Sequence, residues 1–329
     1  MKRFLLLVLV SLQLSAVAQS TDADLAQLMK DRKFADAEKL ANERIASNPK
    51  DEMAVWYLAN IVATDSVKRD TAIAKAEACV KALPDSAKCH HALGRLYGAA
   101  ALSSGLVNGI KYASRIKDQF AKSVELEPGN FESRRDLNQF YLQAPGIAGG
   151  SVRKAMENTD AHGKINAAQG LLLRAEVHIY EKEFDKAENL LAAVRPAGDE
   201  VVARALPQAW MSLGFAMIND KQAAKAQTLF ERQLSIDMNS ALMHFGLGRA
   251  QLENQAVDAA IASMERALKI DSKLGVHYRL GIAYQTKGDK PRAIAAFLQF
   301  LSYVNTGKSA EDARQRLNAL GNSKPGSSS

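Results

Sequence analysis

A glycine-rich segment followed by basic residues is the first part of this sequence that suggests chemistry. The segment 146–151, which reads GIAGGS, precedes a predicted helix that carries Arg153 and Lys154. Backbone N–H groups at the start of such a helix can bind an anion. No Gly-Lys-Ser/Thr follows, however, so the spacing differs from that of a phosphate-binding loop. We therefore interpret the segment as a tight turn between helices that needs glycine at positive φ.

A cysteine and two histidines at 89–91 resemble a set of metal ligands. On a helix, though, the adjacent His90 and His91 point about 100° apart, and no HExxH or Cys-x2-Cys pair accompanies them. His90, His244 and His277 stand at similar places of a repeating pattern, which favours a packing role. We predict no metal site and no cofactor.

Motifs for nucleophilic catalysis are missing from the sequence. There is no Gly-x-Ser-x-Gly segment, and the carboxylate pair Asp199-Glu200 stands at a turn, where acids cap helices. The chain has a net charge of +7, but its basic residues alternate with acids, as in 33–39, which is typical of solvated helix surfaces. We predict a protein that is not an enzyme and does not bind nucleic acid.

The N-terminus has the order of a secretory signal peptide. A cationic start at 1–3 is followed by an apolar run over 4–14, interrupted by Ser11 and Gln13, and by small residues at 16–18. We predict a signal peptide over 1–18 with cleavage after Ala18; an uncleaved anchor is the alternative. The run is shorter than the roughly 20 residues that span a bilayer, and we expect no later stretch to be long and apolar enough. We expect an exported, most simply periplasmic, protein without stable membrane insertion.

An internal repeat dominates the C-terminal half. Leu-Gly pairs at 213–214, 247–248 and 280–281 are spaced by 34 and then 33 residues. A small residue and a large one follow each pair at fixed offsets; they are Ala226, Ala260 and Ala293, then Phe230, Met264 and Phe297. A period of about 34 residues is the signature of an array of helical hairpins. Each hairpin is too small to bury its own apolar face, so stacking produces a continuous core.

The start of one unit, Trp210-Met211-Ser212-Leu213-Gly214, matches the W-x2-L-G opening of tetratricopeptide repeats. The chain resembles tetratricopeptide-repeat proteins over nearly all of residues 22–304. The resemblance implies an all-α fold, a right-handed superhelical solenoid of antiparallel helix pairs. We expect about eight hairpins and a capping helix near 310–320 in one solenoid over 19–320, with a disordered tail over 321–329.

Two segments depart from this pattern. The third hairpin carries roughly ten extra residues between Tyr97 and Ile116, which fit a long helical arm or a protruding loop equally well; Ser104-Gly105 and Asn108-Gly109 mark a loop there. The fourth hairpin contains the glycine-rich segment, and 141–150 is similar to a loop in uncharacterised exported bacterial proteins of this type.

The two cysteines flank the turn between the second and third hairpins. Cys79 lies about five residues before Pro84-Asp85 and Cys89 about five after, which puts them at similar height on neighbouring antiparallel helices. A disulfide needs Cα atoms within about 7 Å, and export would permit one. A disulfide and two small buried thiols both remain open.

The concave face of tetratricopeptide-repeat proteins commonly binds an extended peptide. The family's inward-facing positions correspond here to Trp56, Asn60, His91, Arg95, Arg135, Gln139, Met211, Phe245, Arg249, Tyr278 and Gln285. Arginine pairs carboxylates and aromatic rings anchor apolar groups, so we expect a non-catalytic scaffold for a protein or peptide, acidic or bound by its C-terminus. A small-ligand carrier with a pocket near 98–115 and 144–151 is the alternative, and an enzyme with unrecognised chemistry is the third.

Overall fold

A computed structural model describes residues 22–304 and 306–322 of the chain. The predicted signal peptide and its cleavage point lie outside the described residues. So does most of the predicted disordered tail. Gly321 and Asn322 instead belong to the last helix, which runs two residues past the predicted end.

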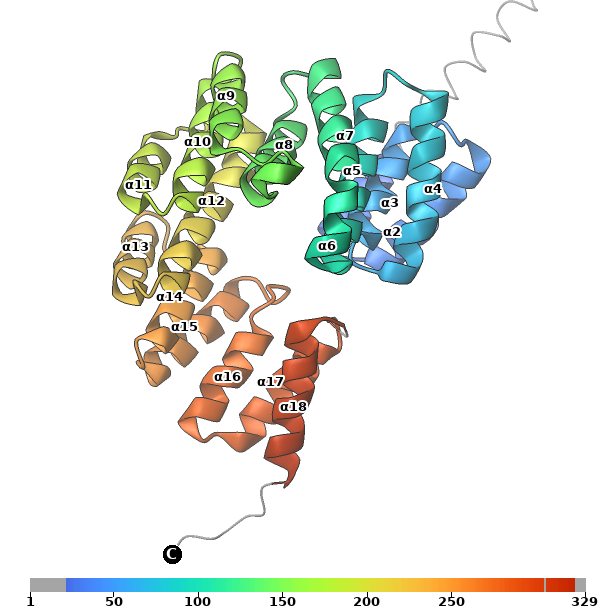
Figure 1. Cartoon of the computed structure of the whole chain (residues 1–329). Coiled ribbons are helices and arrows are strands. Elements are labelled where there is room, and N and C mark those ends of the chain that lie inside the picture. Colours follow the sequence, from blue (N-terminus) through green and yellow to red (C-terminus); the bar gives the residue numbers. More distant parts are fainter. Residues whose placement is uncertain (1–21, 305, 323–329) are drawn as a thin grey trace, which may run out of the picture. The chain divides into compact units, whose positions relative to one another are not determined.

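Every regular element of the described residues is a helix, and consecutive helices pair as hairpins (Figure 1). The first four hairpins are a helix over 22–30 with α2 (Phe34–Ser47), α3 (Glu52–Val62) with α4 (Ser66–Ala82), α5 (Ala87–Ser103) with α7 (Ala113–Leu126), and α8 (Phe131–Gln143) with α9 (Val152–Gly163). The last four are α10 (Ala167–Tyr180) with α11 (Phe184–Ala193), α12 (Glu200–Asn219) with α13 (Ala223–Ile236), α14 (Ala241–Glu253) with α15 (Val257–Ile270), and α16 (His277–Lys287) with α17 (Lys290–Leu301), followed by α18 (Lys308–Asn322). The prediction of eight hairpins and a final helix is confirmed within these residues.

The chain divides into two compact units. Unit 1 ends at Leu173 and unit 2 begins at Arg174, so the boundary falls within α10. Short polar residues begin helices in both units by accepting hydrogen bonds from first-turn N–H groups, as Asp51 does for α3 and Ser240 for α14. These caps make each helix start at a position that local sequence specifies.

Glycines of the first helices receive large side chains of the second helices. A Cβ at Gly214 would lie 2.2 Å from Phe230, and one at Gly281 would lie 2.8 Å from Phe297. Both phenylalanines are fully buried. In the third hairpin the same contact joins Gly94 to Phe120, at 2.6 Å. These partners are 26 residues apart rather than 16, so the insert leaves the repeat packing intact.

The extra residues of the third hairpin are helical, the first of the two alternatives. They lengthen α5 to Ser103 and then form α6 (Gly105–Gly109) and the short η1 (Ile110–Tyr112) before α7. The predicted loop at Ser104-Gly105 exists as a sharp break, with Gly105 at φ +76. The predicted loop at Asn108-Gly109 was wrong, because these residues continue α6; two residues typical of turns did not outweigh helix formation on both sides.

The glycine-rich segment is a tight turn, as interpreted from the sequence. It contains η2 (Gly146–Ala148), and Gly149 has φ +98. A Cβ at Gly150 would lie 1.7 Å from the Ala144 carbonyl oxygen, so only glycine fits. The N–H of Gly150 donates to the Pro145 carbonyl at 3.1 Å. This N–H is therefore used inside the turn.

One helix contradicts the expectation that no later segment is long and apolar enough to cross a membrane. By length and composition, α12 passes that test. It nevertheless buries Val202, Trp210, Leu213 and Met217 inside unit 2, and α13 and α14 pack against it. The composition reflects a core helix that neighbours cover from more than one side.

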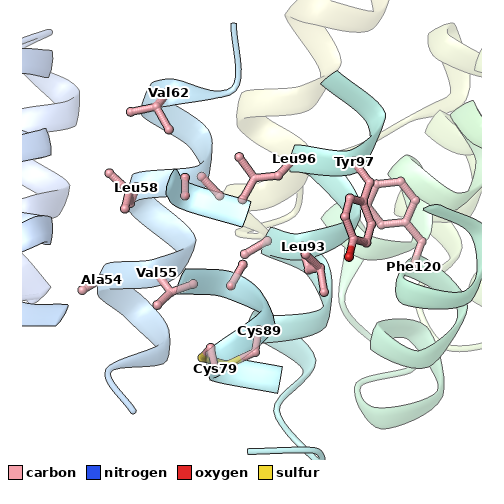
Figure 2. Close-up of a cluster of buried hydrophobic side chains, with 14 of the residues drawn as sticks. Ala54, Val55, Leu58, Val62, Cys79, Cys89, Leu93, Leu96, Tyr97 and Phe120 are labelled. Atoms are coloured by element: carbon pink, nitrogen blue, oxygen red, sulfur yellow. A yellow bond between two sulfur atoms is a disulfide. The ribbon is translucent and has the colours of Figure 1, made fainter. Parts of the chain in front are cut away.

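The core of unit 1 contains the two cysteines. Cys79 at the end of α4 and Cys89 at the start of α5 are joined by a disulfide, with Cα atoms 5.7 Å apart. Figure 2 shows the bond beside the apolar side chains of α3 and α5. Both cysteines are fully buried in this cluster, so the bond ties consecutive hairpins together from inside.

Candidate functional site

A chain of partly buried polar contacts connects the first helices of three hairpins in unit 1. The indole N–H of Trp56 on α3 donates to Nδ1 of His91 on α5, at 3.0 Å. Nε2 of His91 lies 2.9 Å from a carboxylate oxygen of Asp136 on α8. Trp56 and His91 are 35 residues apart, which is one repeat. Equivalent positions of successive first helices therefore meet directly.

The donor and acceptor roles in these two hydrogen bonds identify which ring nitrogen of His91 carries the hydrogen. Indole nitrogen is only a donor, so Nδ1 of His91 must accept and carries no proton. Nε2 then carries the proton and donates to Asp136. The two bonds therefore fit one tautomer of the ring, with the proton on Nε2. His91 is 2% exposed, so water cannot replace either partner.

Arg95 and Asn60 extend the network by one helical turn. Nε of Arg95 lies 3.2 Å from the Asp136 carboxylate, and Nη1 donates to Oδ1 of Asn60. Nη2 of Arg95 has no hydrogen-bond partner among residues 22–304 and 306–322, and the side chain is 34% exposed. The guanidinium is held by two of its nitrogens and presents the third to the surroundings.

Asp136 is the residue that sequence reasoning missed. Counted from the starts of α5 and α8, Arg135 is equivalent to His91, and Arg135 was predicted as one of the family's inward-facing positions. The structure instead brings the next residue to His91. Burial raises the pKa of the Asp136 carboxyl, but the hydrogen bond from His91 and the charge of Arg95 outweigh burial and hold the pKa below its ordinary value. The carboxylate is therefore ionised.

An apolar pocket of about 520 Å³ lies beside this network in unit 1. Both departures from the repeat pattern border it. Its walls are formed by α5 and its extension, by α6, η1 and α7, and by α8 with the following turn; they include Ala63, Gly98, Ala99, Ala101, Leu102, Gly105, Gly109, Ile110, Ala113, Ile116, Phe120, Gln139, Phe140, Gln143, Ala144, Pro145 and Ala148. Arg95 and Asp136 complete the lining.

Small residues leave the space inside this pocket empty. A Cβ at Gly98 would meet no atom within 4 Å, although Gly94, one turn earlier on α5, is filled by Phe120. Leu102 at the edge of the pocket is 82% exposed, and Ile147 on the neighbouring turn is 90% exposed. The pocket is thus apolar at its walls and rim, with a charged pair on one side.

In unit 2, two predicted residues, Phe245 and Arg249, pack against a partly buried phenylalanine. The rings of Phe215 on α12 and Phe245 on α14 pack edge to face, with centroids 5.9 Å apart. The Arg249 guanidinium stacks over the Phe215 ring at 4.3 Å. Burial and the nearby charge of Arg279 lower the pKa of Arg249. Its Nε is buried and has no hydrogen-bond partner in the described part of the chain. Met211 is only 6% exposed, so little of it faces solvent.

The last two predicted residues contact the capping helix. The hydroxyl of Tyr278 donates to Asp312 at 2.8 Å. The side-chain oxygen of Gln285 accepts from Arg316 at 2.8 Å. Arg316 also binds Asp312 at 2.6 Å. These residues therefore hold α18 against α16. Gln139, in contrast, lies in unit 1 and lines its pocket.

The histidines near the cysteines bind different partners. His90 binds the Pro84 carbonyl and the Gln119 side chain, at 2.9 and 2.6 Å, whereas His91 belongs to the polar network. A group that sequence reasoning did not find is His178, Glu181 and Glu183, whose ligand atoms lie within 4.8 Å of one another. Glu183 already binds His178 and Lys186, each at 2.6 Å, so the cluster satisfies its charges internally.

Comparison with known proteins agrees with this geometry. The tetratricopeptide repeat family model matches residues 241–274, which are α14, α15 and the turn after them. The seventh hairpin is a tetratricopeptide repeat. Gly248 in this repeat accommodates Met264 as Gly214 in the preceding hairpin accommodates Phe230. None of the curated proteins matches the sequence.

Solved structures resemble the whole array. Yeast Tom70 is similar at 15% identity and a TM-score of 0.57, over 88% of this chain and 59% of that one. A tetratricopeptide repeat protein from Parabacteroides merdae is 12% identical with a TM-score of 0.46, over 81% of this chain and 98% of that one. Cut9, in the complex Cut9-Hcn1, is 17% identical with a TM-score of 0.45 over 89% of this chain. This chain spans 54% of Cut9. The fold is that of tetratricopeptide-repeat proteins.

Proposed function

We propose that this protein is an exported, non-catalytic scaffold that holds a protein or peptide partner on the first helices of its hairpins. The observation that carries the proposal is the arrangement around Arg249, whose partly buried cation stacks on Phe215 beside Phe245. The half-buried guanidinium of Arg249 and the aromatic pair offer a partner for a carboxylate and an apolar anchor at one place. An acidic or C-terminal segment fits this chemistry.

A peptide-binding assay tests this proposal. A display library of random peptides with free C-termini is selected on the purified chain, and enriched peptides are measured by calorimetry. We expect enriched peptides to be acidic or to require a free carboxylate, and Arg249→Ala to weaken them about tenfold. Arg266→Ala is the matched control, because Arg266 is exposed on α15 and donates only one long hydrogen bond, to Asn239, within the described part of the chain. Equal weakening by both variants, or no acidic preference, would refute this groove.

Export is part of the proposal and rests on two features. The N-terminal 18 residues have signal-peptide character, and a disulfide between Cys79 and Cys89 persists in oxidising compartments. Fractionation of cells that express the full chain tests it: the mature N-terminus should follow Ala18 and the protein should be in the exported fraction. Recovery of the uncleaved chain from the cytoplasm would refute this part alone.

A second candidate function is favoured by the pocket of unit 1. A small-ligand carrier needs a concave, mostly apolar cavity with a few polar groups, typically of about 300–1,000 Å³. The pocket of about 520 Å³ has this size, and Arg95 with Asp136 supplies the polar side. Its walls come from the two segments that the repeat pattern does not require. We therefore propose the carrier role for unit 1 beside the scaffold role.

A further inference from the structure

We propose that the unit 1 pocket binds a single-chain amphiphile whose carboxylate head pairs with Arg95 and whose hydrocarbon chain lies along α5 and α8. This inference rests on the carrier function proposed above and names its ligand. The apolar walls of the pocket hold the hydrocarbon chain, and the guanidinium of Arg95, on the polar side of the pocket, pairs with the carboxylate.

The walls of the pocket are mostly apolar. Gly98 and Ala101 on α5 line it together with Phe140 and Ala144. At Gly98 a Cβ would meet no atom within 4 Å, so a hydrocarbon chain can approach the α5 backbone there. Apolar walls stabilise a buried hydrocarbon by roughly 25 cal/mol for each Å² removed from water. The exposed Leu102 continues this surface at the rim.

The polar end selects the head group. Asp136 is already bound by His91 and by Nε of Arg95, so its charge is compensated within the protein. Nη2 of Arg95 has no partner among the described residues and lies on a side chain that lines the pocket. A carboxylate can accept from it in a charge-assisted bond, whereas an alcohol forms only a weaker bond and a quaternary ammonium is repelled.

Three probes with one hydrocarbon chain test the inference: dodecanoate, dodecanol and dodecyltrimethylammonium, each titrated below its micelle concentration with the purified full chain. We expect dodecanoate to bind about tenfold more tightly than dodecanol, as one charge-assisted bond implies, and the ammonium to bind least. Arg95→Met should remove the preference for the acid while leaving dodecanol unchanged.

Gly98→Leu locates the site. A Cβ at position 98 meets no atom within 4 Å, and the change replaces a glycine inside a helix, so the fold should be retained or stabilised. We expect it to weaken dodecanoate at least about tenfold. Ala262→Leu, at an exposed position of α15 in unit 2, should leave binding unchanged. Far-UV circular dichroism and thermal melts confirm that each variant is folded.

The possible failures separate the two levels of the proposal. Equal binding of acid and alcohol, both lost in Gly98→Leu, overturns the carboxylate ligand and keeps the carrier. Binding of none of the probes, or binding that Gly98→Leu does not alter, overturns the carrier and with it this inference. If peptides instead compete for a site that Gly98→Leu blocks, the pocket belongs to the scaffold function and the amphiphile is refuted.

Discussion

Replacing Asp136 by alanine should destabilise unit 1 far more than the corresponding change at Asp312 destabilises unit 2. Each carboxylate accepts a hydrogen bond from a side chain of a first helix, Asp136 from His91 and Asp312 from Tyr278, and each forms an ion pair with an arginine. The partners differ in burial: the His91 side chain is 3% exposed, whereas Tyr278 is half-buried.

The magnitude follows from what remains after truncation. In Asp136→Ala, the Nε2–H of His91 stays buried, with 3% of its side chain exposed, and a buried donor without an acceptor costs about 1–3 kcal/mol. Arg95 is one third exposed, so its lost bond adds at most about 1 kcal/mol. We expect a total of about 2–4 kcal/mol. Asp312 is 37% exposed, and water replaces it, so Asp312→Ala should cost about 1 kcal/mol or less.

Urea denaturation measures both effects. Far-UV circular dichroism follows the whole chain, and fluorescence of Trp56 in a Trp210→Phe background reports unit 1, since these are the two tryptophans. Asp136→Asn is an informative intermediate, because its amide oxygen still accepts from His91. Its cost should fall between those of the wild type and Asp136→Ala. If Asp136→Ala costs no more than Asp312→Ala, the buried network does not stabilise the fold as argued.

The remaining predictions concern pH and repeat packing. The pKa of the Asp136 carboxyl in the folded chain lies below its ordinary value of 3.8. The ionised carboxylate therefore stabilises the fold above pH 3.8, and this stabilisation is lost as the pH falls through the lower pKa of the folded state. The difference in urea midpoint between wild type and Asp136→Asn should consequently close in acid. The pKa of the Tyr97 phenol is shifted in the opposite direction, since burial and a hydrogen bond to a glutamate raise it to about 12. The protonated phenol therefore contributes its full stabilisation below about pH 10 and loses it toward pH 12. Tyr97→Phe should remove one late-titrating phenol from the ultraviolet titration. Gly214→Ala places a Cβ 2.2 Å from Phe230 and should lower the free energy of unfolding by about 1–3 kcal/mol. Gly98→Ala places its Cβ in open space and should raise the free energy of unfolding by up to about 1 kcal/mol. Equal shifts in melting temperature for the two variants would contradict this packing.

Local sequence determined the helix pairs of this protein. Leu-Gly pairs and large residues at a fixed offset report a contact within one hairpin, such as that of Gly214 with Phe230. Both partners lie within one repeat, so their spacing is visible in the chain itself. The extra residues of the third hairpin and the glycine-rich turn were equally visible, since each breaks a period that the rest obeys.

Only the tertiary structure decided which side chains meet between hairpins. Arg135 and Asp136 are neighbours in sequence, and a small rotation of α8 determines which of them faces His91. The burial of α12 likewise depends on helices that surround it, not on its own composition. The pocket arises because the extension of α5 and the turn after α8 come together around small residues. Repeat spacing reports contacts inside one period, whereas the size and polarity of a cavity depend on the packing angles of several periods at once.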